Sequence, residues 1–417
     1  MRIKIKLKYF TGFIIFFIFT LQFLGCKSYY VRKTFDYPVP NDTSDKSIEI
    51  QEKKIFSIDG IHVDNRFEGA RMNGFRQIDD TTFQIDIKPE RVPVNDSPWY
   101  AFKIWSDTPR TVDLILQYYD GHHRYIPKIS RDRRNWSAIE NIEINDDTMQ
   151  ARFRLNLDTA PLWVSAQELI TTKDIYDWVN NLRTRPYVQE INVAGRSALG
   201  KDLPFVRIGK GEPDKKKVIV VFGRMHPPEI TGFMALQSFT ENLLIKDTLS
   251  ELFFDRFDIW LFPVLNPDGV DLGHWRYNAN GVDLNRDWAY FRQPEVNQIS
   301  RFILDRAKKH RNKIILGLDF HSMDRDTYYV FDDSFRTDLK DFKRLYTAAI
   351  DRCVYPFRTD YEPTPLSEPY AKTWFYIQFK AESIIYEVGD NTPRDIIRNK
   401  AKAAAVELMG LLPQFIK

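Results

Sequence analysis

The chain has 417 residues, which is too many for one typical domain and comfortable for two. Hydrophobic residues make up 43% and charged residues 28% of it, as is ordinary for a globular protein, and an aromatic fraction of 14% favours sizeable cores. The formal net charge is only +3, so the overall charge gives no case for nucleic-acid binding, and we expect no nucleic-acid partner.

The N-terminus predicts an export signal. A basic stretch, MRIKIKLK, precedes the apolar run at 9–24, which is short for a membrane span but typical of a signal peptide. The run ends in FLGC, where Gly25 directly precedes Cys26, and this resembles a bacterial lipobox whose cysteine carries lipid after cleavage. We therefore expect a signal peptide at 1–26, lipidation of Cys26 as the membrane anchor, and a periplasmic or surface-facing place in the bacterial cell envelope. An uncleaved N-terminal anchor is the alternative.

Cys353 is the second of only two cysteines. If Cys26 is acylated, Cys353 has no partner, so we expect no intramolecular disulfide and a buried structural thiol at this position. Residues 27–53 are polar and mixed in composition, which predicts a flexible tether.

Residues 54–165 predict an all-β domain. Apolar residues alternate or run together in four segments, at 81–89, 99–107, 111–120 and 149–157. Asp, Asn, Gly and Pro separate the segments, and no long helical pattern interrupts them. A β-sandwich is the fold we expect for this domain.

Strand and helix patterns alternate in residues 166–417. Strands are expected at 217–222, 257–265, 313–320 and 383–389, and helices at 165–184, 231–245, 294–310, 338–353 and 394–412. This alternation predicts an α/β domain with a mixed, largely parallel sheet flanked by helices on both faces. Functional sites in such sheets gather at the carboxyl ends of the strands.

The stretch GRMHPPEITG, at 223–232, follows the first of these strands. It holds His226 and Glu229 three residues apart, a spacing that can bring an imidazole and a carboxylate onto one zinc ion. Pro227 and Pro228 each fix a φ angle and stiffen the turn between them. An isolated His-x-x-Glu is more often an ordinary strand-to-helix turn, so this stretch alone is compatible with either a metal site or a purely structural turn.

A third ligand has to come from elsewhere in the chain. His321 directly follows the predicted strand at 313–320, and Asp319 could support its imidazole. Two imidazoles at strand ends together with Glu229, in one α/β domain, favour a metal site over separate structural roles. The sequence therefore predicts His226, Glu229 and His321 as metal ligands.

A longer motif resembles that of a known enzyme family. The stretch FPVLNPDGVDLGHWRYNANGVDLNRDW at 262–288, with HPPE, His321 and YEVGD at 386–390, resembles the zinc carboxypeptidase family. The details look most similar to the cytosolic carboxypeptidase branch, which trims glutamates from protein tails and carries a β-sandwich before its catalytic domain. The resemblance implies a carboxypeptidase-like fold and a catalytic domain over 166–417.

The resemblance also implies a cofactor and a mechanism. It places one Zn2+ per chain on His226, Glu229 and His321, and it makes Glu387 the general base that takes a proton from zinc-activated water. A carboxylate that emerges from an apolar strand beside a dication suits that work.

Three further residues match substrate contacts of the family. Arg276 corresponds to the arginine that polarises the scissile carbonyl and stabilises its oxyanion. Asn285 and Arg286 correspond to the pair that grips the terminal carboxylate of the substrate, and a guanidinium can hold a carboxylate through two hydrogen bonds. The expected substrate is therefore a peptide with a free C-terminal carboxylate.

The same resemblance implies roles for two further residues. The family has a mobile tyrosine that closes over the substrate, and Tyr370 is the preferred candidate over Tyr361 and Tyr376. Lys372 lies 15 residues before Glu387, where the family has a residue of the side-chain pocket. A lysine there would favour acidic C-terminal residues, or it is a solvated lysine on a loop. The sequence YEVGDNTPR departs from what the glutamate-trimming relatives carry around the general base.

These observations together predict a zinc-dependent metallocarboxypeptidase that hydrolyses the C-terminal peptide bond of peptides and prefers acidic C-terminal residues. One alternative is a zinc-dependent amidase or deacylase acting on peptidoglycan peptides or acyl-amino acids. Such enzymes share the His-x-x-Glu and His pattern but generally lack the NPDG and DLNR run. A non-catalytic binding protein on the same fold is the other alternative, and the retained ligands, Arg276 and Glu387 argue against it.

Overall fold

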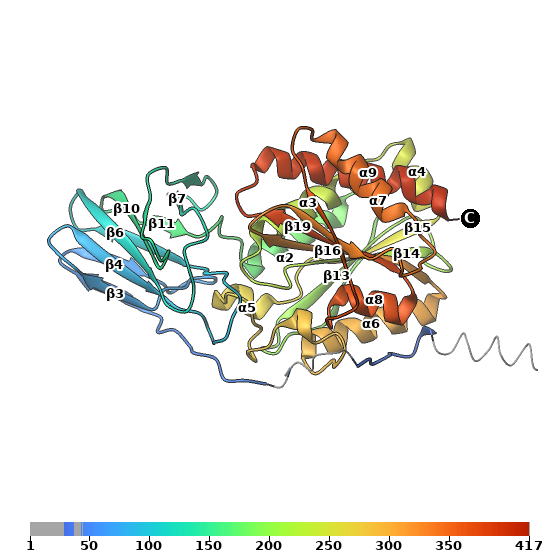
Figure 1. Ribbon diagram of the computed structural model, residues 1–417, viewed down its shortest axis with the longest axis horizontal. Helices are drawn as coiled ribbons and strands as arrows, with labels where there is room; N and C mark the ends of the chain where they lie inside the picture. The colour runs from blue at the N-terminus through green and yellow to red at the C-terminus, as the bar shows by residue number, and fades with distance from the viewer. Residues whose placement is uncertain (1–28, 37–42, 44, 417) are drawn as a thin grey trace, which may run out of the picture.

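The computed structural model describes residues 29–36, 43 and 45–416 (Figure 1). The predicted signal peptide and Cys26 lie outside these residues. Within the described ranges, the helices are all too short or too polar to cross a membrane.

Two β-sheets pack face to face in the N-terminal region, at the left of Figure 1. In the first sheet the strands follow the order β1 (Ile55–Ile58), β2 (Ile61–Asp64), β5 (Ala101–Ser106), β11 (Leu162–Ser165), β7 (Lys128–Ser130) and β8 (Ser137–Ala138). In the second the order is β3 (Gly74–Gln77), β4 (Thr82–Ile87), β6 (Arg110–Tyr118), β10 (Gln150–Leu157) and β9 (Glu143–Ile144). Buried and exposed residues alternate along β10, as they do in a strand with one face on the core. The predicted β-sandwich is confirmed.

An eight-stranded sheet forms the centre of the C-terminal region. Its order is β12 (Val188–Arg196), β13 (Asp202–Ile208), β15 (Phe257–Phe262), β14 (Lys217–Gly223), β16 (Lys313–Met323), β19 (Glu382–Gly389), β17 (Thr327–Phe331) and β18 (Asp360–Thr364). The four middle strands, β15, β14, β16 and β19, are parallel to one another. β12 and β13 on one side and β17 on the other join them in antiparallel pairs. The sheet is therefore mixed and parallel at its centre, as predicted.

Helices cover both faces of this sheet, which separates two apolar cores (Figure 1). One face carries α2 (Thr172–Asn181), α3 (Ile230–Leu243), α4 (Thr248–Phe254), α7 (Phe342–Cys353) and α9 (Arg394–Phe415). The other face carries α6 (Pro294–His310) and α8 (Ala371–Phe379). The short elements are η1 (Leu182–Thr184), α5 (Pro267–Leu272) and η2 (Leu284–Arg286).

The start of α2 shows how local sequence sets a boundary. Thr171 caps the helix, and its backbone N–H donates to the carboxylate of Asp174 at 2.8 Å, which completes a capping box. The helix therefore begins at Thr172. Residues 165–171 share the apolar spacing but are not helical, and Thr171 is one of the N-caps that the sequence itself offers, with Thr172 and Asp174.

Two expectations differ from the structure. Cys353 is exposed, not buried, because it is the last residue of α7, where that helix runs past the core. The segment expected to be a flexible tether makes specific contacts in its described part. Tyr29 packs against Phe379 with ring centroids 5.3 Å apart, and the Gln51 amide donates to the Ala70 carbonyl at 2.7 Å. Composition alone did not predict these contacts.

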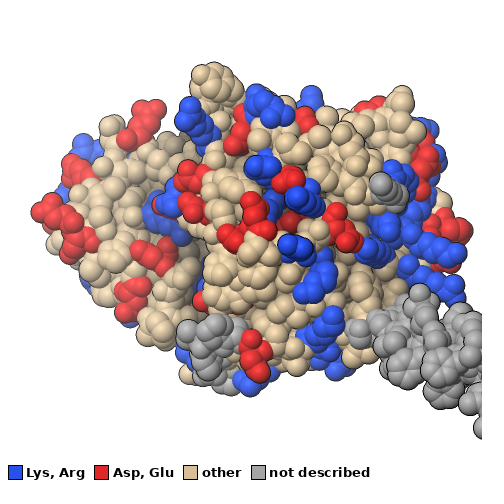
Figure 2. Space-filling model, turned by 45° about the vertical axis from the view of Figure 1, so that its right-hand side comes forward, with Lys and Arg blue, Asp and Glu red and all other residues tan. Residues whose placement is uncertain are grey.

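Acidic and basic side chains are interspersed over much of the face that Figure 2 shows. This mixture agrees with the small net charge of +3.

Candidate active site

The residues singled out from the sequence gather at the carboxyl ends of the parallel strands. His226 and Glu229 lie in the turn between β14 and α3, and Glu387 lies near the end of β19. β16 extends to Met323, so His321 lies within this strand, near its carboxyl end, and not directly after it. Arg276 lies in the long connection that follows β15 and α5.

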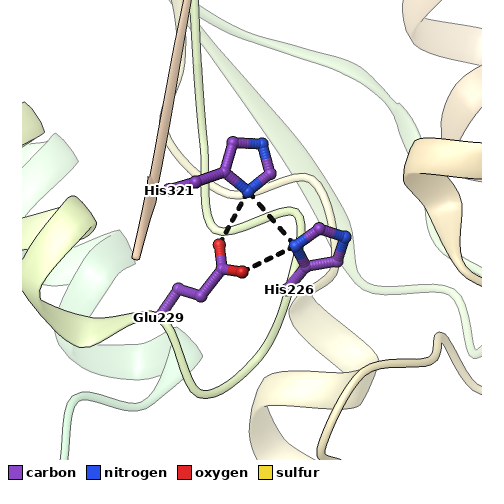
Figure 3. A group of neighbouring side chains, drawn as sticks. All are labelled: His226, Glu229 and His321. Carbon is purple, nitrogen blue, oxygen red and sulfur yellow. Dashed lines mark hydrogen bonds and ion pairs between the residues drawn. The ribbon is translucent and has the colours of Figure 1, made fainter. Parts of the chain in front are cut away.

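His226, Glu229 and His321 point toward one another (Figure 3). Nδ1 of His226 lies 2.7 Å from one carboxylate oxygen of Glu229, and Nδ1 of His321 lies 2.7 Å from the other. The two Nδ1 atoms are 3.1 Å apart. All three side chains are buried, with at most 9% of each exposed. The expected ligand set therefore converges on one point.

Two carboxylates orient these imidazoles from behind. Nε2 of His226 lies 3.1 Å from the Asp283 carboxylate, and Nε2 of His321 lies 3.0 Å from that of Asp319. A proton on Nε2 of His226 leaves its Nδ1 lone pair directed into the cluster, which is how a metal-binding histidine is usually held. The contact between His321 and Asp319 is an ion pair that lacks hydrogen-bond geometry. Asp319 was expected in this place.

The cluster suits a zinc ion. Two imidazole nitrogens and one carboxylate are a common catalytic zinc set, and ligand atoms about 2.0–2.1 Å from one tetrahedral ion are separated by little more than 3 Å. Burial opposes the charge on Glu229, but His226 and His321 hold the pKa of its carboxyl well below the usual range. A buried carboxylate facing two imidazole lone pairs has the charge and geometry that a dication requires.

The turn HPPE is held firmly against β16. Ser322 accepts hydrogen bonds from the backbone N–H of Gly232 and the hydroxyl of Thr231, both at 2.8 Å. A Cβ on Gly232 would lie 2.4 Å from the backbone oxygen of His321, so only glycine allows α3 to approach β16 this closely. The first turn of α3 thus fixes two ligands relative to the third.

Glu387 lines the same cavity as the metal cluster. Burial raises the pKa of its carboxyl to about 8. Among the described residues its Oε2 atom is buried without a hydrogen-bond partner. A carboxylate in this state accepts a proton readily near neutral pH.

Arg276 lines the same cavity, beside Asp283 and Glu229. Its Nε donates to Asp283 at 2.9 Å, and its Nη1 lies 3.8 Å from Glu229. Burial opposes its charge, but these two carboxylates raise the pKa of the guanidinium. Asp283 therefore orients both Arg276 and His226.

Asn285 and Arg286 lie side by side on η2. The side-chain oxygen Oδ1 of Asn285 accepts from the backbone N–H of Ala371 at 3.0 Å. The Arg286 side chain lies 3.6 Å from Asp283 and 3.5 Å from Glu368, at the outer limit of hydrogen bonding. Its Nη1 also donates to the backbone oxygen of Asn285 at 3.3 Å, so the guanidinium is loosely engaged by its described partners.

Tyr370 stacks on the guanidinium of Arg286, 4.5 Å from the ring centroid, and lines the cavity. The other candidate tyrosines lie elsewhere: Tyr361 is on β18, and Tyr376 packs against Phe331. The structure thus brings Tyr370 to the site and leaves the other two outside the cavity lining.

Lys372 is buried, not solvated, and it also lines the cavity. Its ammonium group donates to the carbonyl of Val330 at 3.1 Å and to the hydroxyl of Thr364. Burial lowers the pKa of Lys372 to about 7.

One cavity of about 340 Å³ joins these groups. It is lined by the three ligands and by Arg276, Asn285, Arg286, Tyr370, Lys372 and Glu387. Asn95, Ser97 and Arg124 of the N-terminal β-region also line it. Nothing in the sequence pattern indicated these three residues.

Asp283 is the main residue of the site that sequence reasoning missed. It is the aspartate of the DLNR motif, two residues before Asn285, and that position in the motif was the available signal. Although burial opposes its ionisation, Arg276 and His226 hold the pKa of its carboxyl well below the usual range.

Comparison with known proteins identifies the class to which this fold and site belong. The model of the zinc carboxypeptidase family matches residues 175–392, which include all the ligands together with Arg276, Asn285, Arg286 and Glu387. The chain belongs to this family, whose cofactor is zinc.

Individual relatives agree with this assignment. Cytosolic carboxypeptidase 2 of Xenopus tropicalis is 35% identical over 113 residues, which are 27% of this chain and 12% of that protein. The chain thus aligns with only a small part of this curated relative. Two solved metallo-carboxypeptidases share the fold. The one from Pseudomonas aeruginosa, in complex with (2-guanidinoethylmercapto)succinic acid, has a TM-score of 0.71 and 18% identity, over 85% of this chain and 99% of that one. The one from Burkholderia cenocepacia has a TM-score of 0.70 and 16% identity, over 85% and 100%.

Proposed function

We propose that the protein is a zinc-dependent carboxypeptidase that removes the C-terminal residue of peptides. The observation that carries the proposal is the single cavity that joins the metal cluster, the proton acceptor Glu387 and the loosely engaged Arg286. A metal alone suits many hydrolytic reactions, whereas a guanidinium beside it selects substrates with a free carboxylate.

Glu387 is the proposed general base. Zinc, when bound by His226, Glu229 and His321, polarises a carbonyl and makes a water a better nucleophile at neutral pH. Glu387 takes the proton from the attacking water and delivers it to the departing amine. Burial raises the pKa of this carboxyl, whereas a dication bound beside it would favour the charged form that takes the proton from water.

Arg276 is the proposed oxyanion stabiliser. Its guanidinium supplies fixed positive charge where the tetrahedral intermediate becomes negative, and Asp283 holds it in place through the 2.9 Å contact. Because the group is oriented before the substrate arrives, little reorganisation is needed during the reaction.

Arg286 and Asn285 are the proposed site for the terminal carboxylate. Among the described residues, the carboxylates paired with Arg286 lie 3.5 and 3.6 Å away, so a substrate carboxylate can form two shorter hydrogen bonds to its guanidinium. The Pseudomonas protein is in complex with a succinic acid derivative, which carries carboxylates, and this supports an acid-binding site in the fold. Tyr370 lies over the face of the Arg286 guanidinium, which leaves the N–H groups in the guanidinium plane open to a carboxylate.

A preference for acidic C-terminal residues is part of the proposal. Lys372 lines the cavity, and its ammonium group donates to Val330 and Thr364. Because an ammonium group has three N–H donors, one remains for a substrate side chain in the cavity. A carboxylate beside this buried amine would favour its charged form.

The location is also a proposal and rests on the sequence of residues 1–26 alone. If Cys26 anchors the protein in the cell envelope, then C26S abolishes incorporation of a labelled fatty acid and releases the protein from membranes. Unchanged labelling in C26S would contradict the lipid anchor.

The proposed activity is tested with a mixture of peptides that carry free carboxylates. We expect mass spectrometry to show products shorter by one C-terminal residue, and we expect chelation to stop their formation until zinc is restored. Internal cleavage, or release of an acyl group from the N-terminal end, would favour the amidase alternative instead.

A further inference from the structure

The N-terminal β-region contributes several contacts that hold the loop carrying Arg276. Trp275, next to Arg276, is fully buried and belongs to the core between the two N-terminal sheets. Its indole N–H donates to the backbone oxygen of Trp99 at 3.1 Å. The residue before Arg276 is thus a packed part of the β-sandwich.

Glu90, which follows β4, holds the backbone of this loop. One of its carboxylate oxygens accepts the N–H of Trp275 at 2.8 Å. The other accepts the N–H groups of Arg276 at 3.0 Å and Tyr277 at 2.8 Å. Three consecutive N–H groups, with Arg276 in the middle, therefore converge on one side chain.

The charge of Glu90 suits this role. The residue is fully buried and lies outside the cavity lining, so it does not act on the substrate. Burial opposes its ionisation, but His274, Arg71 and the N–H groups of Tyr277 and Trp275 keep the pKa of its carboxyl below the usual value. Arg71 also donates to the backbone oxygen of Gly273 at 3.4 Å, which ties the start of the same loop to the β-region.

We propose that Glu90 is a positioning residue that sets the place of the Arg276 guanidinium, so that the N-terminal β-sandwich completes the active site. The inference rests on the proposed role of Arg276. A buried carboxylate can satisfy three N–H donors, whereas an amide offers one acceptor oxygen and turns an NH2 group toward them. A small displacement of a catalytic group costs up to about 100-fold in rate.

The test is a double-mutant cycle with Glu90→Gln and Arg276→Ala in the full chain. We expect Glu90→Gln to lower kcat about 10- to 100-fold with KM changed less than about twofold, because the substrate carboxylate is held elsewhere. In the Arg276→Ala background we expect Glu90→Gln to have almost no further effect on kcat. Glu90→Asp keeps both oxygens on a shorter side chain and should recover part of the loss. If Glu90→Gln does not fold, Glu90→Asp replaces it in the cycle.

Asp258→Asn is the matched control. Asp258 is also a fully buried carboxylate, paired with Arg207 at 2.6 Å, but it lies at the amino end of β15, away from the cavity. Its loss should lower the melting temperature and leave kcat unchanged in both backgrounds.

The possible failures are distinguishable. Equal losses from Glu90→Gln with and without Arg276, or no loss of kcat in Glu90→Gln, would overturn the inference and leave the proposed function intact. An unchanged kcat in Arg276→Ala would contradict the role of Arg276 itself and overturn the inference with it.

Discussion

His321 and Glu387 are register partners on the adjacent parallel strands β16 and β19. Register partners direct their side chains to the same face of a sheet, so the third metal ligand and the proton acceptor reach one cavity from neighbouring strands. A slip of one residue in either strand would send its side chain to the opposite face. The pairing of these two strands therefore fixes the relation between metal and base.

Glu387→Gln should separate catalysis from metal binding. Glutamine has the same size but cannot accept the proton, so we expect kcat to fall by about 10²- to 10⁴-fold. Zinc content should stay at about one per chain, because Glu387 is not among the clustered ligands. Metal analysis and kinetics on the same preparation check both results, and full activity in this variant would contradict the mechanism.

Loss of a metal ligand should weaken zinc binding more than loss of the carboxylate that orients that ligand. His226→Ala deletes one of three ligands, so we expect the purified protein to contain little zinc. Asp283→Asn keeps the ligand but weakens the contact to its Nε2, and we expect zinc affinity to fall about 10- to 100-fold. Competition with a chelator of known affinity measures this.

Asp268→Asn is the control for the effect of Asp283→Asn on zinc. Asp268 is a buried carboxylate bound to Ser197 at 2.8 Å, outside the metal cluster. We expect zinc affinity to be unchanged in this variant. Equal losses of affinity in both variants would contradict a specific role for Asp283.

Gly232→Ala should loosen the metal site through the backbone. The new Cβ would lie 2.4 Å from the backbone oxygen of His321, so α3 or β16 has to shift. We expect the free energy of unfolding to fall by about 1–3 kcal/mol, the usual cost of adding a group to a well-packed core, and we expect zinc to bind more weakly. Denaturant titration and zinc competition measure the two effects.

Gly410→Ala is the matched control for this substitution. Gly410 is in α9, and a Cβ there would have nothing within 4 Å. We expect stability to be unchanged or slightly higher, since alanine favours the helix. Wild-type stability and zinc affinity in Gly232→Ala would show that the close approach is not needed.

Lys372 should make substrate preference depend on pH. Its pKa is lowered to about 7 by burial, and a lysine is charged below its pKa. We therefore expect kcat/KM to favour C-terminal Glu over Gln more strongly at pH 6 than at pH 8.5, because kcat/KM reports the free enzyme. A charged hydrogen bond corresponds to a preference of about 10- to 100-fold.

Lys372→Met should remove this preference and its pH dependence, because methionine fills similar space without charge. The two peptides differ only in the last side chain, so the ratio of their kcat/KM values isolates the contact. An unchanged preference for Glu in this variant would exclude Lys372 as its source.

Elements with strong local signals were predicted well from the sequence. α6 has the predicted bounds, Pro294–His310, because proline begins the helix and basic residues end it. β18, in contrast, was not expected, because Asp360–Thr364 is mostly exposed, contains proline and has no apolar pattern. α8 was missed because its nine residues are largely apolar and show no one-sided pattern.

The residues of the site also differ in how strongly the local sequence indicates them. The three ligands could be predicted because they follow strands or lie within one short turn. Asp283 is inside a motif but has no signal of its own beyond its neighbours. Glu90 could not be predicted, because it meets Trp275 across 185 residues of sequence through the packing of two regions.

The requirement for a free C-terminal carboxylate is tested with two peptides of the same sequence, one with a free C-terminal carboxylate and one with a C-terminal amide. We predict that the zinc-loaded protein shortens the free peptide by one residue and leaves the amidated peptide intact, because the amide gives Arg286 no carboxylate to bind. Cleavage of both peptides at equal rates would contradict the proposal that this protein is a carboxypeptidase.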